Sequence, residues 1–543
     1  MSSNPTPAPE GKTFFGHPRG LFVLFFAEMW ERFSFYGMRA ILIFYLLQHW
    51  MFSEEKAYAI YAAYAALVYI APVLGGYLAD RYIGQRRAVQ FGAVLLVIGH
   101  GLMAFEGPGP AQYPEFTPAD MQSGMFINIF WLALAFIVMG MGFLKSSISV
   151  LVGQLYEPGD ERRDPAFTIF YMGINLGAAT GSLLAAWLGQ TFGWAWGFGA
   201  AGVGMLLGLV VFVWGRPALQ GRGEAPDPVA LVRRIMGVKL EHWIYFWGLV
   251  GVVVVWFLIQ YQHVVGWLLG ACALAVVGFF LYEAVWKLDR IARHRILAAL
   301  FLIALQPLFW ALFEQAGSSL NVYTDRSVDR NMLGWEVPAG MFQSINAIYI
   351  ITLGPFFAAL WLWLARRGME PSTPAKFGLG LIQLGLGFFV LVWGANASDG
   401  LTPVIFIFLI YLLHTTGELC LSPVGLSAMT KLAPSRLVGL VMGSWFLASA
   451  AGNFLAGKIA QATGGEGLEG AEAADQVLEV YSSVGWLAVL VGVGVIVISP
   501  LVARLMHQDK EQLRQDRELA GQQAVGEPAA TGIDQSGDDV RRT

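Results

Sequence analysis

Apolar segments of membrane-spanning length recur from one end of the chain to the other, and short polar segments separate them. About 20 apolar residues in a helix cross the ~30 Å hydrocarbon core of a bilayer, whereas outer-membrane barrels show short alternating segments. The pattern therefore predicts an all-α polytopic membrane protein. We expect about fourteen spans, at 21–47, 56–80, 86–105, 125–155, 165–189, 192–215, 242–262, 265–286, 295–320, 337–365, 373–394, 401–429, 435–460 and 480–506.

The spans divide into two groups of six with a helix pair between them. We expect an N-terminal segment at 1–20, a six-helix bundle at 21–215, a linker with two additional spans at 216–294, a second six-helix bundle at 295–506, and a polar tail at 507–543. The tail is expected to be a short amphipathic extension followed by disorder. Secondary transporters commonly pair six-span halves around a site near the membrane midplane. The extra pair has no deep charges and is interpreted as a structural accessory.

Basic residues are concentrated in alternate loops. They follow the second, fourth, sixth, eighth and tenth spans, whereas 106–124 and 461–480 contain neither lysine nor arginine. Because lysine and arginine accumulate on the cytoplasmic side of membrane proteins, both termini are predicted to be cytoplasmic. The first 19 residues are polar and lead directly into a full-length span, which does not match a cleavable signal peptide. We expect a multi-pass protein of the cell inner (plasma) membrane.

Composition narrows the class of function. The chain has 543 residues, of which 56% are hydrophobic and 13% charged, and its net charge of −4 is too small to indicate a nucleic-acid partner. Cys272 and Cys420 both lie in apolar segments and indicate neither a disulfide framework nor a metal site. The histidines are scattered without metal-ligand spacing. An enzyme would need a nucleophile with its base, or metal ligands, so we expect neither an enzyme nor a cofactor.

A charged stripe lies inside the first span. Glu28, Arg32, Tyr36 and Arg39 follow one another at spacings that place them on one helix face, over about 16 Å of axial rise, with Glu31 at its edge. Ionised groups at membrane depth are costly and normally face a protein interior or a water-filled cavity. The stripe therefore indicates a solute path more strongly than structural pairing.

Further polar groups lie deep in later spans of both halves: Lys145, Asn175, Glu314, Asn346, Glu418 and Trp445. Interhelical hydrogen bonding is the alternative interpretation for the asparagines, a buried ion pair for the charged residues, and packing for the tryptophan. Counting deep charges gives three bases against four acids, which leaves one carboxylate without an obvious partner. We hypothesise that this surplus carboxylate carries a coupled proton.

Three motifs resemble those of known transporters. The turn GGYLADRYIGQRR (75–87) resembles the loop motif of the major facilitator superfamily, although a plain positively charged turn is the alternative interpretation. EMWERFSFYG (28–37) resembles the ExxER segment of the proton-dependent oligopeptide transporters, called POT or PTR, and FYMGINLG (170–177) resembles their fifth-span signature. The similarity runs from about Phe14 to Met506. It implies a major facilitator fold and proton-driven uptake of di- and tripeptides. We expect a monomer in the lipid bilayer.

The resemblance also implies roles for individual residues. Glu28, Glu31 and Arg32 match the residues implicated in proton coupling together with Lys145, and Arg39 and Lys145 match the bases near the peptide carboxylate. The remaining matches are Glu314 near the peptide amino group, Tyr36, Asn175 and Asn346 as polar binding residues, Trp445 and Tyr69 as pocket aromatics, and Glu418 and Ser422 in the region that closes towards the cytoplasm. Many relatives have Lys-Pro in the fourth span, whereas here Ser146 follows Lys145, which puts local helix bending in doubt.

Two alternating ion pairs would connect the halves. We expect Arg39 with Glu314 as the extracellular-side pair and Lys145 with Glu418 as the cytoplasmic-side pair, each weakened when protonation or peptide binding favours the other state. Such pairs suit an alternating transporter better than a passive channel. Some family members move nitrate or other organic anions, and that substrate class is the alternative to peptides.

Overall fold

The computed structural model describes residues 13–157, 160–464 and 470–507, and it is almost entirely helical. Twelve of the described helices are long and apolar enough to cross a membrane. Two further helices of similar length, α1 (Arg19–Phe44) and α3 (Gln85–Met103), carry more charge and stand among them, so the expected set of about fourteen fits. The protein is a multi-pass membrane protein. The expected tail lies outside the described residues except for His507.

The first bundle follows a β-hairpin made by β1 (Thr13–Phe14) and β2 (His17–Pro18). Its long helices begin with α1, which continues as a π-helical turn at Tyr45–His49. The others are α2 (Glu54–Leu78, continued by a π-turn at Ala79–Ile83), α3, α5 (Met125–Gln154), α6 (Arg163–Phe192) and α7 (Trp194–Gly215), with short α4 (Pro118–Met121) in the loop before α5.

Glycines let α1 and α6 approach each other closely. Gly173, Gly177 and Gly181 recur every fourth residue along α6, inside and just beyond the FYMGINLG motif. A Cβ built at Gly177 would lie 2.1 Å from the backbone oxygen of Met29, and one at Gly181 would lie 2.2 Å from that of Phe33. Small residues at this spacing are typical of close helix packing in membranes. The motif therefore fixes α6 directly against the segment of α1 that carries the charged stripe.

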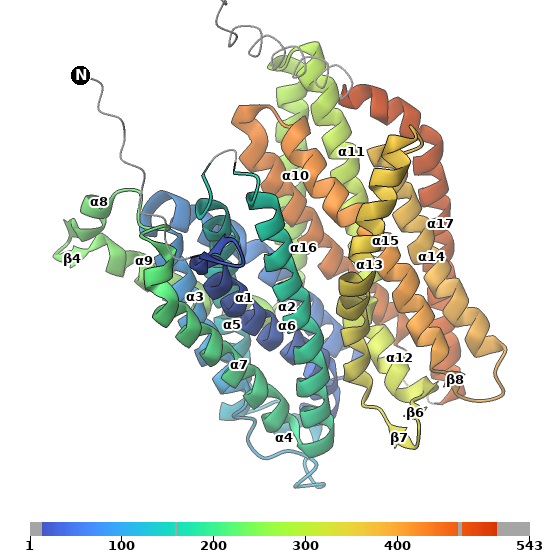
Figure 1. Cartoon of the computed structure of the whole chain (residues 1–543). Coiled ribbons are helices and arrows are strands. Elements are labelled where there is room, and N and C mark those ends of the chain that lie inside the picture. The colour runs from blue at the N-terminus through green and yellow to red at the C-terminus, as the bar shows by residue number, and fades with distance from the viewer. Residues whose placement is uncertain (1–12, 158–159, 465–469, 508–543) are drawn as a thin grey trace, which may run out of the picture.

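The linker and the accessory helix pair join the two bundles. A 3-10 turn (Arg216–Leu219), α8 (Pro228–Val232) and a hairpin of β3 (Arg234–Ile235) and β4 (Val238–Lys239) precede α9 (Leu240–Gln260) and α10 (Gln262–Trp286). Helix α9 packs along α5 of the first bundle, and α10 contacts α2 of the first bundle as well as α11 and α16 of the second (Figure 1). Only 17% of the most apolar stretch of α10 is buried, so this helix presents most of its surface to the bilayer.

The second bundle contains α11 (Arg290–Phe313), α12 (Ser319–Ser327), α13 (Ser344–Arg366), α14 (Thr373–Asn396), α15 (Ile405–Leu432), α16 (Val438–Thr463) and α17 (Ala471–Met506). A 3-10 turn at Ala339–Gln343 leads into α13, and another at Ser435–Leu437 leads into α16. Strand β5 (Val328–Asp329) pairs in parallel with β8 (Thr402–Pro403), and β6 (Asn331–Met332) forms a hairpin with β7 (Trp335–Glu336).

Two spans differ from the sequence-based expectation. The span expected at 295–320 begins at Arg290 and is broken by a 3-10 turn at Glu314–Gly317 before it continues to Ser327. Helix α17 begins at Ala471 instead of 480, because its first residues are polar helix formers that a search for apolar length does not detect.

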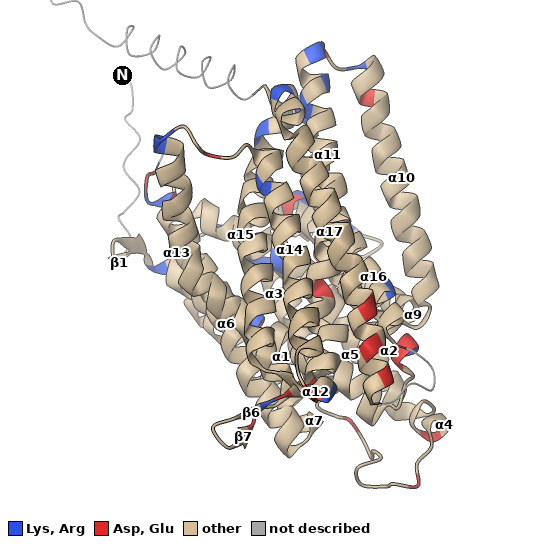
Figure 2. Ribbon diagram, turned by 90° about the vertical axis from the view of Figure 1, so that its right-hand side faces the viewer, with Lys and Arg blue, Asp and Glu red and all other residues tan. Residues whose placement is uncertain are grey.

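The bundles meet at one end and separate at the other. We call the end with the α2–α3 turn the basic face, because Lys and Arg gather there (Figure 2). We call the opposite end, with α4 and the β6–β7 hairpin, the loop face. At the loop face, the Asn321 side chain donates to the Ala40 oxygen across 3.1 Å, and Ala62 of α2 packs on Gly457 of α16. Towards the basic face, Val73 and Tyr77 continue the same side of α2 but are 45% and 60% exposed. The interface between the bundles is therefore closed at the loop face and open at the basic face.

Candidate functional site

The ExxER stripe of α1 forms a buried cluster of charges. Glu28, Glu31 and Arg32 are 3%, 1% and 4% exposed. The Nε atom of Arg32 lies 3.0 Å from Glu28 Oε1 and 2.5 Å from Glu31 Oε2. One guanidinium thus serves two carboxylates, and among the described residues neither Glu28 Oε2 nor Glu31 Oε1 has a hydrogen-bond partner. With both carboxylates ionised, Arg32 would balance only one of them, and a buried charge without a partner is unfavourable.

Lys145 of α5 lies near the charged cluster of α1. Its Nζ atom lies 4.1 Å from the centre of the Tyr69 ring, at a distance suited to a cation–π contact. Its charge is near enough to act on Glu28 and Glu31, but no ion pair joins Lys145 to any described residue in this conformation. Helix α5 runs unbroken through Lys145 and Ser146, so Lys145 stands on a continuous helix.

Arg39 and Glu314 join the two bundles. The Nη2 atom of Arg39 on α1 forms an ion pair with Glu314 Oε2 at the end of α11. The Nε atom of Arg39 donates to the Tyr61 hydroxyl across 2.9 Å. The expected contact is present, whereas its gating role stays a prediction. Glycine at position 317 leaves room for Tyr61 beside this pair, since a Cβ there would lie 2.0 Å from the Tyr61 hydroxyl.

Glu418 of α15 has a neutral partner. The Asn346 side chain of α13 donates to Glu418 Oε2 across 3.0 Å and to Thr415 Oγ1 across 3.1 Å. The ion pair expected between Lys145 and Glu418 is therefore not formed in this conformation. Each charge is held by an uncharged neighbour within its own bundle, because the bundles are apart at the basic face.

The other expected site residues lie on α1, α6, α15 and α16, and their binding roles stay predictions. Asn175 donates to the Tyr171 oxygen on its own helix, at 3.0 Å. Trp445 is buried in the second bundle, where its ring lies against Gly425 and Phe377. Tyr36 lies beside Arg39, whose guanidinium carbon is 5.7 Å from the centre of its ring. Ser422 is half-buried on α15, one helical turn beyond Glu418.

Tyr61 and Thr415 are site residues that sequence reasoning missed. Tyr58, Tyr61 and Tyr64 recur every third residue along α2, which places several hydroxyl groups on neighbouring positions of a buried helix. That spacing could have indicated Tyr61 as a polar residue of the site. The sequence did not indicate a role for Thr415, because its bond with Asn346 joins two different helices. Its hydroxyl also donates to the backbone oxygen of Tyr411, as is common for threonine in a helix.

The distribution of charge between the two bundles suits binding of a zwitterion. Bases from α1 and α5 stand on the first bundle, and the acids Glu314 and Glu418 stand on the second. Within the described residues, no group of three or more His, Cys, Asp and Glu could hold a metal ion. Two hollows of about 620 and 920 Å³ lie near the loop face, and neither is lined by any of the expected site residues.

Comparisons with known proteins decide the family. The family model described as POT family matches residues 86–467. The chain belongs to the POT family. This POT protein is 39% identical over 481 residues to the peptide transporter YePEPT of Yersinia enterocolitica, covering 84% of this chain and 89% of that protein. It is 34% identical over 466 residues to dipeptide and tripeptide permease A of Erwinia pyrifoliae, covering 84% and 88%.

Solved structures agree with the fold. A crystal structure of a peptide transporter POT in complex with sulfate superposes on the POT protein with a TM-score of 0.76 at 36% identity, covering 91% of this chain and 97% of that one. A POT family transporter in complex with 5-aminolevulinic acid has a TM-score of 0.76 at 30% identity, covering 90% and 98%. The expected major facilitator fold is thus confirmed, and two six-helix bundles with an inserted helix pair fit it.

Proposed function

We propose that this POT protein is a proton-coupled symporter that imports di- and tripeptides by alternating access. Its family and the names of its relatives support this class of substrate. The observation that carries the proposal is the division of charge, with Arg39 and Lys145 on one bundle and Glu314 and Glu418 on the other. We further propose a monomer without cofactor in the cell inner membrane, with the basic face and both termini in the cytoplasm, as the distribution of basic residues supports.

A short peptide has a carboxylate at one end and an ammonium group at the other. We assign the carboxylate to Arg39 and Lys145 and the ammonium group to Glu314, with Glu418 and Asn346 nearby. Charge-assisted hydrogen bonds of this kind are about twice as strong as neutral ones. The variable side chains would then lie among Tyr36, Tyr69, Asn175, Ser422 and Trp445, so that the two ends dominate recognition and selectivity is broad.

The coupled proton is assigned to the ExxER cluster. Glu28 and Glu31 share one guanidinium, so a proton on one carboxyl group would leave a balanced ion pair. We assign the proton to Glu31, with Glu28 as the alternative carrier. Loss of this proton would return a negative charge to the neighbourhood of Lys145. Lys145 would then release the peptide carboxylate and bind the glutamate instead.

The observed conformation corresponds to an inward-open state under this orientation. The Arg39–Glu314 pair would then help to close the extracellular side, and the missing Lys145–Glu418 pair would form when the cytoplasmic side closes. Protons and peptide change the balance between these states only to the extent that they bind them unequally.

Uptake by proteoliposomes tests the proposal. Labelled dialanine should accumulate above its external concentration when an inward proton gradient is present, and a protonophore should abolish the accumulation. Equilibration without accumulation would indicate a passive route. Gradient-driven uptake of nitrate but not of dialanine would favour the alternative substrate class.

A further inference from the structure

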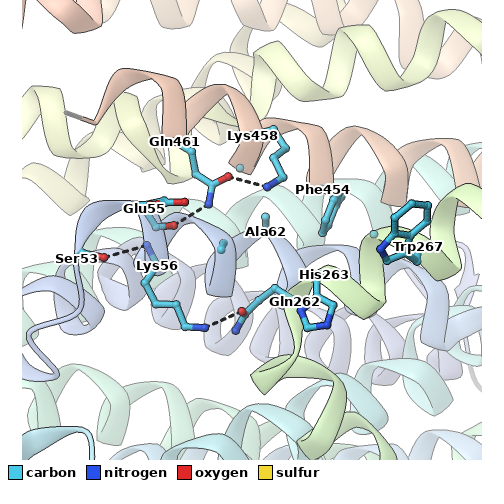
Figure 3. A pocket seen from close by; sticks show the side chains of 13 residues that line it. Ser53, Glu55, Lys56, Ala62, Gln262, His263, Trp267, Phe454, Lys458 and Gln461 are labelled. Atoms are coloured by element: carbon cyan, nitrogen blue, oxygen red, sulfur yellow. Dashed lines mark hydrogen bonds between the residues drawn. The ribbon is translucent and has the colours of Figure 1, made fainter. Parts of the chain in front are cut away.

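A lateral pocket of about 620 Å³ lies where three spans end at the loop face. Figure 3 shows its lining residues on α2, α10 and α16. Ser53 is the N-cap of α2, Gln262 begins α10, and Gln461 lies in the last turn of α16. Helix ends of this kind lie at the level of lipid headgroups. Because α10 is only slightly buried, the pocket opens at the periphery of the protein, away from the charges assigned to peptide transport.

Two lysines occupy the polar part of this pocket. The Lys56 Nζ atom donates to Gln262 Oε1 across 2.9 Å, and the Lys458 Nζ atom donates to Gln461 Oε1 across 2.9 Å. Among the described residues, neither ammonium group forms an ion pair, so each keeps donor capacity for an anion. With Glu55 as the acid of the pocket, the charged side chains sum to a net charge of about +1, His263 being counted as neutral.

The other part of the pocket is apolar and aromatic. Trp267 is 79% exposed, and the ring of Phe454 lies directly against Gly266. An exposed tryptophan at a span end is typical of the membrane interface, and lysine side chains commonly extend towards the headgroups there. Next to the pocket, α10 offers further exposed apolar side chains, such as Leu274, along which acyl chains can lie.

We propose that this pocket binds a phospholipid, with the phosphate held between Lys56 and Lys458 and the acyl chains beside Trp267. A phosphodiester carries one negative charge, which matches the net charge of the lining side chains. Lysine is an established phosphate-binding side chain. The pocket is built from α2 of one bundle and α16 of the other, and the Gln461 side chain donates to the backbone carbonyl oxygen of Glu55 across 2.9 Å. The bound lipid therefore contacts both bundles where they meet.

Native mass spectrometry of the full chain in detergent, titrated with phosphatidylglycerol, tests the proposal. The double variant Lys56→Gln/Lys458→Gln is expected to bind the lipid about tenfold more weakly. This change corresponds to a loss of about 1.4 kcal/mol of binding free energy. Lys239→Gln/Lys431→Gln makes the same charge change on exposed residues of the basic face and serves as the matched control. Equal weakening in the two double variants, or none in the first, would overturn the proposal.

Two further arms separate the lipid from a free anion. Trp267→Ala should weaken phosphatidylglycerol binding severalfold, because it removes apolar contact with the acyl chains. Inorganic phosphate should compete only at concentrations far above those of the lipid. Competition at equal concentration would make the pocket a site for small anions and overturn the lipid assignment. The single variants Lys56→Gln and Lys458→Gln, each checked by thermal unfolding, keep the comparison possible if the double variant does not fold.

Discussion

Arg39 of the first bundle is bound to Glu314 of the second, and the Tyr61 hydroxyl accepts a further hydrogen bond from Arg39. These contacts lie on the side where the bundles meet. Breaking a buried ion pair by removing one partner is usually costly, because it leaves the other charge uncompensated. Closure of the loop face thus depends on the same groups to which we assign the two ends of the peptide, so peptide binding and closure are coupled through one site.

The first prediction concerns the hydroxyl of Tyr61. Tyr61→Phe removes an acceptor from Arg39, and a hydrogen bond to a charged group contributes about 1.5–3 kcal/mol. Because Tyr61 and Arg39 lie on the same bundle, only the part of this contribution that orients Arg39 towards Glu314 affects opening, and we expect the population open at the loop face to rise severalfold. Distances between spin labels at Ser123 and Leu333, one on each bundle and both exposed, measure that population.

Tyr64→Phe is the matched control. The Tyr64 hydroxyl is buried and has no hydrogen-bond partner among the described residues, so its removal should leave the distance distribution unchanged. If both variants behave like the wild type, Tyr61 does not position Arg39.

The second prediction concerns Glu314. If this carboxylate holds the peptide amino group, Glu314→Gln should weaken binding of free dipeptides by tenfold or more, while binding of amino-blocked dipeptides changes little. Isothermal titration with both ligands measures the difference. Equal losses for the two ligands would leave Glu314 as a gating residue alone.

The third prediction concerns the packing of α6 on α1. Gly177→Ala would place a methyl group against the Met29 oxygen, and overpacking of this kind costs about 1–3 kcal/mol. We expect a lower thermal unfolding midpoint and weaker transport, since the backbone beneath Arg32 must move. Gly270→Ala, where no atom lies within 4 Å of the added carbon, should not lower the midpoint. Similar midpoints for the two variants would contradict the close-packing account.

The fourth prediction separates accumulation from exchange. Glu31→Gln cannot change its charge, so gradient-driven accumulation of dialanine should be lost, whereas counterflow requires only binding and alternation and should remain measurable. Glu28→Gln is expected to behave similarly. The exposed loop residue Glu115 supplies the control, and Glu115→Gln should accumulate normally. Unimpaired accumulation in both α1 variants would place the coupling proton elsewhere, on Glu314 or Glu418.

Much of this architecture follows from local properties of the sequence. Apolar length predicts the spans, and the stripe on α1 predicts that Glu28, Arg32 and Arg39 face the interior, because helix periodicity is local. The break at Glu314 could not be predicted from apolar length, and the close approach of Gly317 to Tyr61 of the other bundle is a tertiary contact that a local pattern does not show. The pairing of Glu418 with Asn346 instead of Lys145 depends on which face of the interface is closed, and that is a property of the conformation rather than of the motif.

Simultaneous measurement of peptide and proton movement tests the coupling most directly. Proteoliposomes that contain a pH-sensitive dye and have equal pH on both sides are given an inward dialanine gradient, with the membrane potential clamped. If dialanine enters together with protons, the lumen should acidify at a rate proportional to peptide entry, and Glu31→Gln should abolish the acidification. Entry of dialanine through the wild-type protein without any change in luminal pH would contradict proton-coupled symport.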